Sequence, residues 1–162
     1  MRLNNQVGFF QVILTLVFTM CLRVVPLSEE MALLNPDWVL LVLIYWVLSL
    51  PDRVGIFYAW TFGLLTDELT GRLLGQYALA YSLIVYLCLK FHNRLRQFPF
   101  FQQGLFIFFC LLLSQLLLFF TKNLQHPAQL HASFWLPVFT GTLCWPFVYS
   151  LMRFISFFRF IK

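Results

Sequence analysis

The residues best suited to chemistry lie in one segment, where two adjacent acids, Asp67 and Glu68, interrupt an apolar stretch. An ionisable side chain inside a membrane span is costly and often marks a proton or ion pathway. A relay needs further ionisable groups at the same depth, and the other apolar stretches show none. Ion coupling is therefore the weaker interpretation of this pair.

Asp67 also belongs to a series of small residues that repeats every four positions. The members of this series are Gly63, Asp67, Gly71 and Gly75. On one continuous helix they would form a narrow stripe, because each step of four drifts by about 40° around the axis. Small residues allow helices to approach closely, and Asp67 should face protein, with Arg72, a Thr hydroxyl or a backbone N–H as its partner. Alternatively Asp67 caps a helix beside a tight turn, because Gly71 is typical of a helix stop.

No other group of residues predicts a catalytic or metal centre. His126 and His131 are five positions apart and have no third ligand, so we predict neither a metal nor a cofactor. The sequence contains no GxSxG or HExxH motif and no glycine-rich phosphate loop, and we predict no enzyme. The cysteines lack CxxC spacing and are interpreted as packing residues. They are Cys21, Cys88, Cys110 and Cys144.

Composition predicts a membrane protein. Of 162 residues, 61% are hydrophobic and 10% charged, whereas a soluble domain carries about 25% charged residues. The net charge of +5 does not indicate a nucleic-acid partner, because the Lys and Arg residues stand singly between apolar runs. We therefore predict one integral membrane domain over residues 1–162, with membrane lipid as its surroundings.

The apolar runs predict an all-α transmembrane bundle, because a segment in lipid must satisfy its own backbone hydrogen bonds. Six spans are predicted, at about 6–25, 32–50, 54–70, 73–89, 100–121 and 134–152. The second is short, since only 14 residues separate Pro36 from Pro51, and a crossing needs about 20. Asn35 is expected to cap it, with Asp37 favoured by the helix dipole. Five spans with a re-entrant Asp67 segment are the alternative.

Positive charge predicts the orientation, because short cytoplasmic loops collect Lys and Arg. With the N-terminus inside, only Arg23, Arg72 and Lys122 of the eleven basic residues fall outside. We therefore expect both termini in the cytoplasm. The cytoplasmic cluster of Lys90, His92, Arg94 and Arg96 is expected to face anionic lipid headgroups.

Several short motifs, taken in order, resemble one family. They are Asn35-Pro36-Asp37-Trp38, Tyr45-Trp46, Leu50-Pro51, the four-residue series that includes Asp67, and finally Trp145-Pro146 with Leu151-Met152-Arg153. Together they resemble the rod shape-determining protein MreD family, over the whole chain. Trp145 and Pro146 match that family's last span. Glu68 departs from the pattern, in which an apolar residue is usual.

The resemblance implies a non-enzymatic inner-membrane subunit of the bacterial cell-elongation complex, which helps to regulate or position peptidoglycan synthesis. The implied partners are an MreC-like single-span protein, the MreB filament, a RodA-like glycosyltransferase and the elongation transpeptidase. The family is also said to resemble the substrate-binding components of vitamin transporters, so a solute-binding transporter subunit is the alternative. We expect the stripe of Gly63, Asp67, Gly71 and Gly75 to pack internally or against the MreC-like span.

Reporter fusions test the number of spans. Fusions after residues 30, 52, 72, 94, 128 and 162 should alternate from outside to inside, because each adjacent pair of sites brackets one predicted span. Alkaline phosphatase activity measures the outer sites, and fluorescence of a cytoplasmic reporter measures the inner ones. If the fusions after residues 52 and 72 report the same side of the membrane, the six-span prediction is contradicted.

Overall fold

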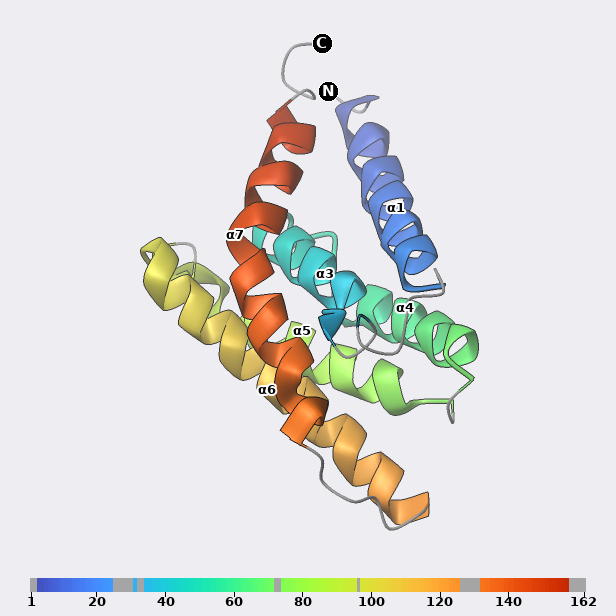
Figure 1. The fold of residues 1–162 in the computed structure, drawn as a ribbon. Helices are drawn as coiled ribbons and strands as arrows, with labels where there is room; N and C mark the ends of the chain where they lie inside the picture. The colour runs from blue at the N-terminus through green and yellow to red at the C-terminus, as the bar shows by residue number, and fades with distance from the viewer. Residues whose placement is uncertain are drawn as a thin grey trace.

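The chain folds into a bundle of α-helices (Figure 1). The computed structural model describes residues 3–24, 31, 34–71, 74–95, 97–125 and 132–157, and these contain no strand. The elements are α1 (Leu3–Val24), α3 (Trp38–Ser49), α4 (Ile56–Leu69), α5 (Gln76–Leu95), α6 (Phe100–Gln125), the 3-10 helix η1 (Ala132–Trp135) and α7 (Leu136–Phe157). The all-α prediction is confirmed, and each α-helix overlaps one predicted run, in order. The number of membrane crossings stays a prediction.

The centre of the bundle is α3, which is buried on every side. All its residues from Val39 to Leu48 are buried, and it contacts α1, α5 and α7. A helix that is apolar all round is stable only where protein or lipid surrounds it completely. With 12 residues, α3 is about 18 Å long, much less than the hydrocarbon thickness of about 30 Å. The helix over the second predicted span is therefore short, as the spacing of Pro36 and Pro51 predicted, and it lies in the core of the bundle.

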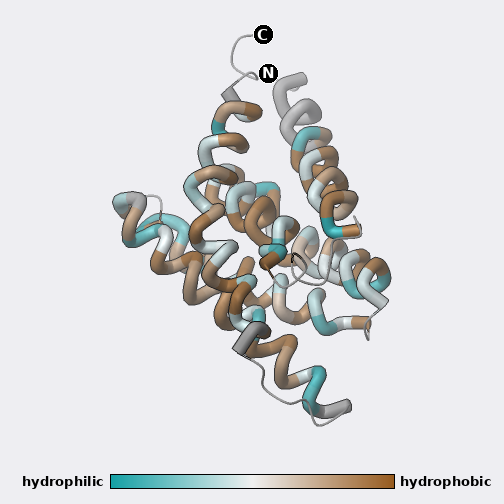
Figure 2. Tube along the Cα trace, in the orientation of Figure 1, coloured by the Kyte–Doolittle hydropathy of each residue, from teal (hydrophilic) through white to brown (hydrophobic). Residues whose placement is uncertain are grey.

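The two longest apolar helices lie at the side of the bundle. Within α6 and α7, Phe101–Asn123 and Leu136–Ser156 are long and apolar enough to cross a membrane. The middle of α6 is mostly hydrophobic, with hydrophilic residues near its ends (Figure 2). Both helices expose large apolar side chains, including Phe109 and Leu143, the latter 80% exposed. Such outward apolar faces are consistent with a helical membrane protein surrounded by lipid.

A glycine sets the unusually close approach of α4 and α5. A Cβ atom placed on Gly63 would lie 2.4 Å from the Cα of Ala78 and 2.6 Å from its backbone N. No side chain fits there without moving one helix. The small residues Gly63 and Ala78 thus allow α4 and α5 to pack with their backbones in contact.

The predicted stripe does not form, because α4 ends at Leu69. The connection to α5 contains Gly71 with φ 61° and Gly75 with φ 105°. These left-handed conformations favour glycine and interrupt the helix. Gly63 therefore lies at the interface of α4 and α5, while the other two glycines form the turn between these helices.

Replacing Gly63 with Ala tests the close approach. The added methyl group should force α4 and α5 apart and lower the free energy of unfolding by about 1–3 kcal/mol, as overpacking does. Gly104→Ala on α6 is the matched control, because a Cβ there meets no atom within 4 Å. Thermal unfolding of the purified proteins in detergent measures both. Equal stability of the two variants would contradict the interpretation.

Candidate functional site

Four side chains from three parts of the bundle form a polar cluster, defined as Arg23, Asp37, Tyr77 and Tyr81. The Nη1 atom of Arg23 donates to Asp37 Oδ1 over 2.9 Å. The hydroxyl of Tyr81 lies 2.7 and 2.8 Å from the two oxygens of the same carboxylate. Asp37 therefore links the end of α1 to the first turns of α5.

Arg23 makes a second set of contacts, all with Tyr77. Its Nη2 atom donates to the Tyr77 hydroxyl, and its guanidinium lies 4.6 Å from the centre of the Tyr77 ring. A guanidinium over an aromatic face is attracted by the ring quadrupole. The side chains of Arg23 and Asp37 are only 19% and 16% exposed, so water screens their attraction less than it would at the surface.

Asp37 also begins α3, which explains its position. Its side chain accepts a hydrogen bond of 3.3 Å from the backbone N–H of Leu40, as an N-cap residue does. The expectation that Asn35 is the cap was wrong, because the helix starts two residues later, after Pro36. Asn35 instead accepts a hydrogen bond of 2.7 Å from the Trp38 indole.

Asp67 caps a different helix from the one that carries it. Its carboxylate is fully buried and accepts hydrogen bonds from the backbone N–H groups of Gly75 and Tyr77, both at 2.9 Å, and of Ala78 at 3.3 Å. These donors lie at the start of α5, where N–H groups have no partner within the helix. Asp67 on α4 thus supplies the first turn of α5 with acceptors. Arg72, another candidate partner, lies outside the described residues.

The remaining predicted residues take separate places. Trp145 lies on α7 and is buried in the core of the bundle, with 2% of its surface exposed. Its ring contacts that of Tyr149 at a centroid distance of 6.0 Å. Pro146 is exposed in the interior of α7. Pro36 is buried where α7 crosses, since its Cβ lies 3.5 Å from a Cβ placed on Gly141. Pro36 directly precedes Asp37 of the polar cluster in the chain, whereas Trp145 and Pro146 lie on α7.

Some predicted positions fall outside the described part of the chain, namely His126, His131 and Arg96. Within the described part, no group of three or more His, Cys, Asp or Glu side chains is placed to hold a metal ion. Gln115 connects α6 to η1, because its Nε2 atom donates to the Phe134 carbonyl over 2.8 Å.

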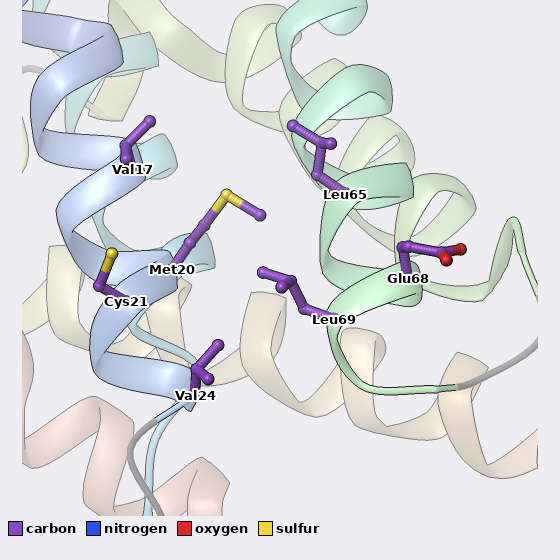
Figure 3. A pocket seen from close by; sticks show the side chains of 7 residues that line it. All are labelled: Val17, Met20, Cys21, Val24, Leu65, Glu68 and Leu69. Atoms are coloured by element: carbon purple, nitrogen blue, oxygen red, sulfur yellow. The ribbon is translucent and has the colours of Figure 1, made fainter.

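An apolar groove lies between α1 and α4 (Figure 3). Its volume is about 470 Å³. The lining residues are Val17, Met20, Cys21, Val24, Leu65, Glu68 and Leu69. Figure 3 shows Met20 and Leu69 extending toward each other across the gap. Among the lining residues that the structure describes, Glu68 is the one charged side chain, and it is exposed while its neighbour Asp67 is buried.

Sequence reasoning missed Arg23 as a site residue, because the charge rule treated it only as an outer loop charge. The available signal was the pair Tyr77 and Tyr81, whose spacing of four places both hydroxyls on one helix face. The groove between α1 and α4 had no comparable signal, since it depends on how two separated helices pack.

Comparison with known proteins identifies the family. The family model described as rod shape-determining protein MreD matches residues 4–155 of the chain, a stretch that includes the polar cluster, Asp67 and the groove. The chain belongs to the MreD family. A protein named rod shape-determining protein MreD, from Haemophilus influenzae, is 33% identical over 145 residues, which cover 90% of each chain.

Membership of the MreD family confirms the resemblance and supports a rod-shape-determining role. No solved structure matches the chain. The similarity of the MreD fold to the substrate-binding components of vitamin transporters therefore stays a prediction.

A double-mutant cycle tests the ion pair of the polar cluster. Arg23→Gln and Asp37→Asn should each lower the free energy of unfolding by about 2 kcal/mol, between the values typical of exposed and buried pairs. The double variant should lose less than the sum, because each single change leaves the other charge without its partner. Glu68→Gln, at an exposed position, is the control. Strictly additive losses in thermal unfolding would show that the two residues are not coupled.

Proposed function

We propose that this chain is a non-enzymatic inner-membrane subunit of the bacterial cell-elongation complex. It holds an MreC-like single-span protein and so helps to position peptidoglycan synthesis by a RodA-like glycosyltransferase and the elongation transpeptidase, near the MreB filament. The observation that carries the proposal is the match to the MreD family over residues 4–155.

Recognition of such a partner occurs mainly through helix faces. The connections between α3 and α4 and between α4 and α5 contain only six residues each, at positions 50–55 and 70–75. Segments of this length offer little surface outside the membrane. The outward faces of the helices, by contrast, carry many exposed apolar side chains.

The groove between α1 and α4 is the proposed binding site for the transmembrane span of the partner. The described residues of its lining are apolar except for Glu68, and a single apolar helix can lie against two others by van der Waals packing. Glu68 lies in the last turn of α4, so it favours a partner with a Lys or Arg at the same end of its span. The exposed thiol of Cys21 lies in the same groove.

Filling the groove tests both the role and its location. Leu65→Trp, at a half-exposed groove position, should prevent co-purification of the MreC-like protein and fail to restore rod shape in cells depleted of this chain. Leu143→Trp on α7 is the control, because Leu143 is 80% exposed and lies outside the groove. This variant should still recover the MreC-like protein and restore rod shape. Cell shape is measured by microscopy, and partner recovery by affinity purification.

The two parts of the proposal fail separately. Cells that keep their rod shape after depletion of the chain would overturn the elongation role. A folded Leu65→Trp variant with normal partner recovery and normal cell shape would overturn the groove as the interface. Circular dichroism and thermal unfolding of both Trp variants establish that they fold.

A further inference from the structure

A second hollow lies at the other end of α3 and α5 from the polar cluster. This polar pocket has a volume of about 480 Å³. Its lining residues are Ser49, Leu50, Pro51, Asp52, Arg53, Leu89, His92 and Asn93. Ser49 is the last residue of α3, and the next four follow it in the chain. The last three share one face of α5, at spacings of three and four.

The surroundings of the polar pocket are basic. Arg53 and His92 line it together with one acid, Asp52, and Lys90 and Arg94 are exposed beside it on α5. Two helices, α3 and α5, end here. Helix C-termini favour nearby cations, which accounts for the presence of basic residues but not for an open hollow among them.

His92 supplies an independent sign of a missing ligand. Its Nδ1 atom lies 3.3 Å from the Asn93 side-chain oxygen. Its Nε2 atom is enclosed and has no hydrogen-bond partner in the part of the chain that the structure describes. A buried polar atom without a partner is costly, so a polar group of a ligand that reaches Nε2 would satisfy it, as donor or acceptor according to the tautomer of the ring.

We infer that the polar pocket binds a phosphate group, supplied by the headgroup of an anionic phospholipid. Arg53 provides charge-assisted hydrogen bonds to the phosphate oxygens, and His92, Ser49 and Asn93 provide further hydrogen bonds. Basic pockets between transmembrane helices on the cytoplasmic side are known to bind lipid headgroups. The charge bias of the sequence predicts that this end faces the cytoplasm. A soluble phosphate compound shares the same chemistry.

Native mass spectrometry of the full chain in detergent tests this inference. Phosphatidylglycerol, phosphatidylethanolamine and inorganic phosphate are titrated separately. Phosphatidylglycerol should bind most tightly, and Arg53→Gln and His92→Gln should each weaken its binding by about tenfold, through the loss of one hydrogen bond to the phosphate. Lys90→Gln is the matched control, because it removes a neighbouring charge outside the pocket and should change the affinity by less than about threefold.

Every outcome of these titrations either supports the proposed phosphate site or overturns it. Tight binding of inorganic phosphate with the same dependence on Arg53 and His92 supports the phosphate site and assigns it a soluble ligand. Equal losses for Lys90→Gln and Arg53→Gln would reduce the effect to diffuse surface charge and overturn the site, as would equal binding of both lipids by all variants. Thermal unfolding shows that each variant keeps its fold, which the exposed position of Arg53 favours.

Discussion

The fold depends on one constraint, that the N–H groups at the start of a buried helix need acceptors that water cannot supply. Two carboxylates meet this need. Asp37 caps its own helix, α3, and Asp67 reaches from α4 to the first N–H groups of α5. Both also join separate elements, since Asp37 binds Arg23 of α1 and Tyr81 of α5. The carboxylates that cap α3 and α5 thus also connect separate helices of the bundle.

This arrangement gives the groove its two walls. On the α1 side of the groove, the contacts of Arg23 connect the last turn of α1 to the start of α3 and to α5. On the α4 side, the contact of Gly63 with Ala78 and the cap made by Asp67 hold α4 against α5. Because α5 receives both connections, it acts as the common frame against which α1 and α4 are placed. The proposed partner would meet a surface whose two sides are set by polar contacts inside the bundle.

Apolar runs predicted the helices well, because lipid leaves few alternatives for a long uncharged segment. Local spacing was less informative. The series from Gly63 to Gly75 suggested one stripe, yet two left-handed glycines turn it into a helix, a turn and a second helix. The pair of Arg23 and Asp37 lies 14 residues apart in sequence, and Tyr81 lies 44 from Asp37. Contacts over such separations depend on how helices cross, which hydrophobic periodicity does not describe.

The shortness of α3 has a further consequence for how the protein responds to its membrane. A bilayer that thickens or thins acts on helices that touch lipid, by changing their tilt or the exposure of their ends. α3 is enclosed by its neighbours, so its length does not have to match the bilayer. Such adjustment falls instead on the helices with exposed apolar faces, among them α1, α6 and α7. Differences in lipid chain length would therefore reach the centre of the protein through the tilt of the helices that surround α3.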